Sequence, residues 1–173
     1  MKFRIVLFAA ILLFGTPAAH AGEDGKLYKK GLYFARSGQA EFAFMQYRTI
    51  LLKYPDSRYR EDATFAMGEY FFAVNDRVAA KEKFTEYVRD FPEGKGKIFA
   101  LAYLLKIAGL EEDKDSSQKL RNDIITFRQI SLVFRNYKEY TYRSPLNKNY
   151  RALFLIDKIE ISLQGAEFVE ISY

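Results

Sequence analysis

The chain has 173 residues, no cysteine and one histidine, with 27 Lys and Arg against 22 Asp and Glu. Without cysteine it has no thiol nucleophile, no disulfide and no cysteine-ligated zinc site. The mild positive excess is not the charge pattern of a nucleic-acid-binding protein, so we expect no nucleic acid as a partner.

The N-terminal segment has the pattern of a secretory signal. Two cations precede an apolar run from Ile5 to Phe14, and the small-residue triplet Ala19-His20-Ala21 follows. The run is shorter than the roughly 20 residues that span a bilayer, which disfavours the alternative of an uncleaved anchor. We therefore predict removal of residues 1–21 and export of a chain with no transmembrane segment, most simply to the periplasm, with secretion as the other possibility. The export signal carries no lipoprotein cysteine.

The next segment contains one helical-hairpin pattern twice, 37 positions apart. Each copy predicts two helices joined by a short turn and ended by a proline. We expect helices at 26–36 and 40–54 in the first copy, and at 63–74 and 78–91 in the second. The matched pairs are Gly31 and Gly68, Tyr33 and Tyr70, Phe34 and Phe71, Ala43 and Ala80, Tyr47 and Phe84, Tyr54 and Phe91, and Pro55 and Pro92.

This pattern resembles the tetratricopeptide repeat, a pair of antiparallel helices with a small residue in the first helix, alanine and an aromatic residue in the second, and a closing proline. Gly31, Ala43, Tyr47 and Pro55 stand at these positions in the first copy. The lengthened link after each proline is similar to repeats of bacterial envelope proteins of the BamD and YbgF kind. The resemblance implies stacked helical hairpins that bind other proteins.

A degenerate third unit follows the two copies. Apolar residues predict a helix at 98–108, and an acidic link at 111–113 leads to a second helix at 116–134. This unit lacks the alanine and the closing proline, so we interpret it as a cap that covers the end of the stack. The expected apolar face of its second helix consists of Leu120, Ile124, Phe127, Ile130 and Phe134.

Beyond residue 136 the hydrophobic pattern alternates, which predicts strands at 139–143, 150–155, 159–163 and 169–173. A helix at 150–156 is the alternative for the second of these. The Gln164-Gly165 pair favours a hairpin, but a two-residue loop would place Ile159 opposite Glu170 and mix the faces. We therefore expect a longer loop that pairs Ile161 with Val169 or Ile171.

The predicted fold is mainly α: tetratricopeptide-like hairpins, with two repeats plus degenerate capping helices, and a small C-terminal antiparallel β element. We expect a signal peptide at 1–21, a helical-repeat domain at 22–136 and a β hairpin or sheet at 137–173 packed on the last helix. The open final strand at 169–173 also predicts possible self-association by strand addition.

In the family that the repeat resembles, partner peptides lie in the concave groove lined by the first helix of each hairpin. Transferred by position, the partner-binding groove consists of Tyr28, Leu32, Arg36, Asp62, Phe65, Glu69 and Phe72. The alternative is that the apolar members of this set pack under the C-terminal sheet.

The residues indicate no catalytic group, cofactor or metal site. The leading hypothesis is a non-enzymatic periplasmic or secreted scaffold that binds envelope proteins during cell-envelope assembly or maintenance. The alternative is a glycan- or lipid-binding module whose tyrosine-rich C-terminal sheet, with Tyr140 and Tyr142, contacts the ligand.

Overall fold

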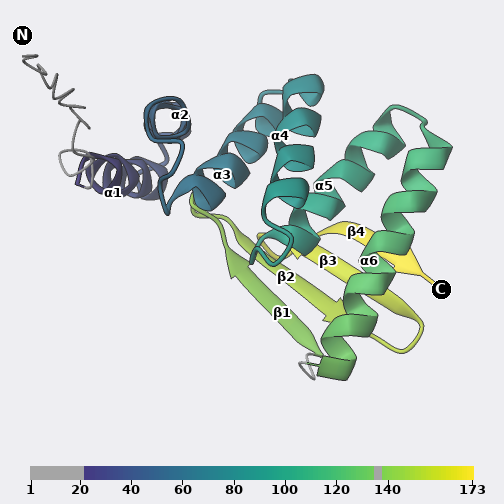
Figure 1. Cartoon of the computed structure of the whole chain (residues 1–173). Coiled ribbons are helices and arrows are strands. Elements are labelled where there is room, and N and C mark those ends of the chain that lie inside the picture. The colour runs from purple at the N-terminus through teal and green to yellow at the C-terminus, as the bar shows by residue number, and fades with distance from the viewer. Residues whose placement is uncertain (1–21, 135–137) are drawn as a thin grey trace, which may run out of the picture.

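The computed structural model describes residues 22–134 and 138–173 (Figure 1). The predicted signal at 1–21 and the predicted domain boundary at 136–137 lie outside the described residues, as do the side chains of 130–134 with the predicted apolar positions Ile130 and Phe134. Within this part of the chain there are six helices and four strands. They are α1 (Glu23–Arg36), α2 (Ala40–Lys53), α3 (Arg60–Ala73), α4 (Arg77–Asp90), α5 (Lys97–Leu110), α6 (Lys114–Phe134), β1 (Glu139–Arg143), β2 (Asn149–Phe154), β3 (Lys158–Leu163) and β4 (Ala166–Ser172).

The protein is thus mainly helical with a C-terminal antiparallel sheet, as predicted. The helices pack in chain order, α1 against α2, α3 against α4 and α5 against α6, and successive pairs lie side by side in the array (Figure 1). Predicted and observed boundaries of the first four helices agree within three residues. None of the described helices is long and apolar enough to cross a membrane.

The two copies of the sequence pattern make the same close approach between paired helices. A Cβ placed on Gly31 of α1 would lie 2.7 Å from the Tyr47 ring of α2. A Cβ placed on Gly68 of α3 would lie 2.8 Å from the Phe84 ring of α4. Each glycine therefore leaves the space that the aromatic ring of its partner helix fills.

The four strands form one antiparallel sheet in the order β1-β2-β3-β4. The β3–β4 connection is a two-residue turn at Gln164 and Gly165, which have φ angles of 53° and 82°, so the predicted longer loop is wrong. The predicted pairing of Ile161 with Val169 is nevertheless confirmed. A bulge leaves Phe168 as an extra residue in β4 and shifts the register by one, which keeps the apolar residues on one face.

Helix α5 lies at the centre of the core, with ten of its fourteen residues buried. It packs between α4 and α6, and the inner face of the sheet covers it. Phe99 of α5 contacts three tyrosines of the sheet, with ring centroids 5.0 to 6.0 Å apart. The strand residues buried on this face are Tyr150, Ala152, Phe154, Ile159, Ile161, Val169 and Ile171.

The sheet contacts the last helix, and it also covers α5 and α3. At α6, the Phe127 ring lies 6.4 Å from Tyr140, and Arg128 Nη2 donates a hydrogen bond of 2.6 Å to the Leu155 carbonyl. At α3, the buried Phe65 ring meets the rings of β1 and β2. Helices α3 to α6 and the sheet therefore share one apolar core, so the sheet is not a separate unit. Strand β4 is an edge of the sheet, and self-association through it stays a prediction.

Replacing Gly31 by alanine tests the close approach. Gly31→Ala forces the new Cβ against the Tyr47 ring, and we expect a loss of about 1–3 kcal/mol in the free energy of unfolding. Gly109→Ala in α5 is the control, because nothing lies within 4 Å of its Cβ position. There the higher helix propensity of alanine should change stability by no more than about 1 kcal/mol, in the stabilising direction. Urea unfolding measures both, and equal effects would contradict the packing.

Candidate binding site

Four of the seven predicted groove residues line one cavity of about 230 Å³. Tyr28, Leu32 and Arg36 come from α1, and Asp62 comes from the first turn of α3. The β1–β2 loop forms the opposite wall, which the sequence did not predict. On this side the cavity is lined by Arg143, the last residue of β1, and by the loop residues Ser144, Pro145 and Asn147.

The other three predicted groove residues, on α3, are covered by the protein's own sheet. Phe65 is fully buried, and its ring lies 5.1 Å from Tyr142 and 5.9 Å from Tyr150. Phe72 is partly buried, and its ring lies 6.2 Å from the bulge residue Phe168. Glu69 is fully buried as well. In the second copy these groove residues pack under the C-terminal sheet, which was the alternative to an open groove.

The β1–β2 loop is fixed to the first hairpin by polar and apolar contacts. The Tyr47 hydroxyl of α2 donates a hydrogen bond of 2.9 Å to the Pro145 carbonyl. Leu146 is buried in the apolar cluster that includes Ala35 of α1 and Ala63 of α3. The second copy has phenylalanine, Phe84, in the place of Tyr47, so the first copy has the hydroxyl that holds the loop. This wall of the cavity is therefore positioned by the core of the first repeat.

The lining of the cavity contains a hydrogen-bonded tyrosine and carboxylate. The Tyr28 hydroxyl donates to Asp62 Oδ2 at 2.5 Å, and the Tyr28 ring stacks on Tyr59 with centroids 4.2 Å apart. Burial raises the pKa of Asp62, while the bond from Tyr28 acts in the opposite direction. Burial and the neighbouring Asp62 raise the pKa of Tyr28. The pair is thus held together in the lining of the cavity, where it offers hydrogen-bonding groups.

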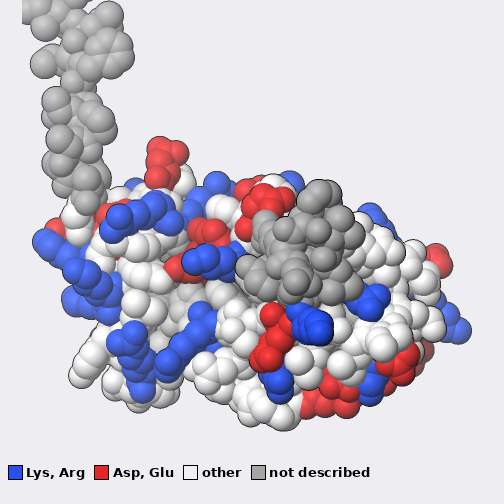
Figure 2. All heavy atoms as spheres, turned by 90° about the horizontal axis from the view of Figure 1, so that it is seen from below, with Lys and Arg blue, Asp and Glu red and all other residues white. Residues whose placement is uncertain are grey.

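Two arginines also line the cavity. Arg36 is exposed, and no hydrogen-bond acceptor or carboxylate of the described residues pairs with its guanidinium group. Arg143 donates from Nε to Asn147 Oδ1 at 3.0 Å, which holds it at the rim. Figure 2 shows that Lys and Arg side chains gather over the end of the molecule built by α1 and α2, where Asp and Glu are fewer, while side chains of both signs are mixed toward the opposite end. The cavity thus lies at the basic end of the protein.

A buried polar cluster joins the covered groove to the sheet. The Glu69 carboxylate accepts a hydrogen bond from the Tyr150 hydroxyl, which lies 2.7 Å from the Tyr103 hydroxyl. The Lys148 ammonium lies 3.9 Å from Glu69 Oε1. Burial raises the pKa of Glu69 to about 7, although Lys148, Tyr150 and Ser144 each lower it. Glu69 therefore changes charge near neutral pH at the joint between α3 and β2.

The tyrosines of the sheet do not form an exposed aromatic surface. Tyr142 and Tyr150 contact Phe65 and Phe99 on the helical side, and the Tyr140 hydroxyl donates to the Lys95 carbonyl at 2.9 Å. The outer face carries ion pairs instead, such as Arg151 with Glu139 at 2.7 Å. Tyr142 and Tyr150 thus pack on the helical side of the sheet, and a glycan or lipid interaction of the sheet stays a prediction.

The described residues contain no cluster of three His, Cys, Asp or Glu side chains that could hold a metal ion. The acidic link before α6 has a structural role, because Asp113 Oδ1 accepts the Ser116 amide at 3.0 Å and caps the helix. Lys81 pairs with Glu111 at 2.7 Å in the same link.

Comparison of the chain with known protein families and with curated proteins finds no match.

The pH dependence of stability tests the Glu69 cluster. The folded chain holds the Glu69 proton to about pH 7, against an ordinary pKa of 4.5, so protonation stabilises the fold fully below pH 4.5. That contribution, about 3 kcal/mol, is lost as the pH rises from 4.5 to 7. In Glu69→Gln the amide imitates the protonated acid, and this part of the pH dependence should disappear. Urea unfolding from pH 5 to 8 compares the two chains, and parallel curves would contradict the assignment.

Proposed function

We propose that this protein is a non-enzymatic binding module of the tetratricopeptide-repeat kind. Its peptide site is confined to α1, the first turn of α3 and the β1–β2 connection. The N-terminal signal pattern supports an exported, periplasmic location, and the similarity of the repeat link to envelope proteins supports a partner in the cell envelope. The repeat pattern and the glycine-to-aromatic contacts of both hairpins support the assignment to this repeat class.

One observation carries the proposal. Tyr28, Leu32, Arg36 and Asp62 were expected to bind a partner from their repeat positions alone, and these four side chains line one open cavity. Residues on two different helices share the site, so it does not arise from one helix surface. The remaining groove positions are covered by the sheet, Phe65 and Glu69 fully and Phe72 in part, which limits binding to the cavity between α1 and the first turn of α3.

The size and charge of the cavity favour a short acidic segment as the ligand. Its volume of about 230 Å³ is below the roughly 300–1,000 Å³ of pockets that enclose a whole small molecule. It therefore suits one or two side chains or a chain terminus. Arg36 and Arg143 offer guanidinium donors at the rim, and charge-assisted bonds to a carboxylate are among the strongest in proteins. The basic end of the molecule would draw such a segment in.

The test is selection of hexapeptides with a free C-terminal carboxylate on the immobilised chain, followed by titration of the best binder. We expect Arg36→Ala to weaken that binder roughly tenfold to a hundredfold, because a charge-assisted hydrogen bond is lost. Amidation of the peptide terminus should cause a similar loss. In Arg36→Ala, amidation should have little further effect, because both changes remove the same interaction. Fluorescence anisotropy measures each affinity.

Arg48→Ala is the matched control, because Arg48 is an exposed arginine of α2 that does not line the cavity. Its affinity for the peptide should equal that of the unchanged chain. The proposal is wrong if Arg48→Ala and Arg36→Ala weaken binding equally, or if amidation leaves the affinity unchanged.

A further inference from the structure

Helix α2 carries a second apolar stripe on the side opposite to its buried one. Its buried stripe is Ala43, Tyr47 and Ile50. On the opposite side, Phe42, Met45 and Leu52 are 52%, 52% and 70% exposed, and Thr49 lies between Met45 and Leu52. We call Phe42, Met45, Thr49 and Leu52 the outer stripe of α2. Exposed apolar groups aligned along one helix indicate a surface that another molecule covers.

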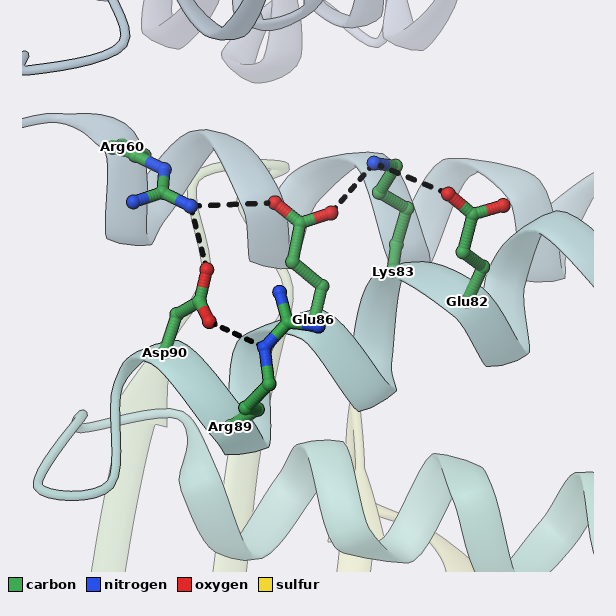
Figure 3. Close-up of polar contacts among 6 residues, drawn as sticks. All are labelled: Arg60, Glu82, Lys83, Glu86, Arg89 and Asp90. Atoms are coloured by element: carbon green, nitrogen blue, oxygen red, sulfur yellow. Dashed lines mark hydrogen bonds and ion pairs between the residues drawn. The ribbon is translucent and has the colours of Figure 1, made fainter.

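The repeat itself does not require this stripe. The same positions in the second copy, 37 residues later, are Ala79, Glu82, Glu86 and Arg89. Figure 3 shows that the charged residues of this face pair with one another and with neighbours. Lys83 lies 3.8 Å from Glu82 and 2.7 Å from Glu86, and Arg89 lies 2.6 Å from Asp90. Arg60 of α3 lies 2.5 Å from Asp90 and 3.8 Å from Glu86. The charged side chains of the α4 face are therefore paired and suit contact with water, whereas the outer stripe of α2 exposes apolar side chains to water.

The spacing of the outer stripe identifies the shape of the missing partner. Positions 42, 45, 49 and 52 follow steps of three, four and three residues, which is the seam of a helix that packs lengthwise against another helix. A helix that lies on a bilayer presents a wider apolar face than this seam. The only polar side chain in the stripe already has a partner, since the Thr49 hydroxyl donates to the Met45 carbonyl at 2.8 Å. If a partner buried the stripe, the Thr49 hydroxyl would therefore keep its hydrogen bond.

We infer that the outer stripe of α2 is the interface of a two-fold dimer in which α2 packs antiparallel against α2 of a second copy. The stripe is symmetric about Tyr47, with Phe42 and Leu52 five residues away on either side and Met45 and Thr49 two residues away. Antiparallel pairing places Phe42 opposite Leu52 of the second copy, and Met45 opposite Thr49. Each layer then joins a larger side chain to a smaller one, which is what a self-complementary interface needs.

A single pair of helices is a small interface, so the dimer should form reversibly with a Kd on the order of micromolar. Sedimentation equilibrium over a range of protein concentrations measures it. The variant Met45→Glu with Leu52→Arg gives the stripe the charged residues that the second copy has at Glu82 and Arg89. Both side chains are more than half exposed, so we expect the fold to stay intact and the Kd to rise at least about tenfold. Val78→Glu changes another exposed apolar residue, outside the stripe, and should leave the Kd unchanged.

Single cysteines test the antiparallel register, because the chain has no cysteine of its own. A mixture of Phe42→Cys and Leu52→Cys chains should form the mixed disulfide. Leu52→Cys alone should not cross-link. In the antiparallel pair, position 52 of one copy and position 52 of the other are offset by ten residues along the helix, about 15 Å, which is beyond disulfide reach. Cross-linking of Leu52→Cys alone would overturn the antiparallel arrangement.

A chain that stays monomeric at every concentration, or a dimer that Met45→Glu with Leu52→Arg leaves unchanged, would overturn the proposal. So would a monomer that binds vesicles of anionic phospholipid and loses that binding in the same variant, since the stripe would then contact a membrane. None of the substituted residues lines the cavity of the first repeat, so peptide binding can be measured separately.

Discussion

Helix α5 is apolar on nearly every side, and a helix of this kind is stable in water only when other elements surround it. Helices α4 and α6 cover two sides, and the inner face of the sheet covers a third. Burial of large side chains, at about 1.5–3 kcal/mol each, stabilises this arrangement. The position of the sheet, and with it the shape of the groove, depends on the need to cover α5.

The sheet that covers α5 also extends over α3. Phe65, Phe72 and Glu69 would face a partner in an open stack of hairpins, but here they contact residues of the sheet. The sheet ends at the first hairpin, where the Tyr47 hydroxyl holds the tip of the β1–β2 loop. The same packing therefore closes the groove of the second repeat and completes the small basic cavity of the first.

The two copies of the sequence pattern present different surfaces. The second copy has a filled groove and an outer face of paired charges on α4. In the first copy the groove is open, with Arg36 at its rim, and the outer face of α2 is apolar at Phe42, Met45 and Leu52. Both surfaces that suit a partner thus belong to the first hairpin, while the second hairpin connects it to the core around α5.

The sequence by itself determined the helices, the strands and the matched positions of Gly31 and Tyr47 in the repeat, because hydrophobic period, proline stops and repeat spacing are local features. It placed Tyr28, Leu32, Arg36 and Asp62 in a groove, but not Arg143 or Asn147, since nothing in their neighbourhood along the chain indicates that the β1–β2 loop reaches α1. Only the tertiary structure decided three features: the bulge at Phe168, the covering of Glu69 by the sheet, and which of the two hairpins keeps an open groove. They depend on contacts between residues far apart in the chain, which form only when the sheet closes on α5.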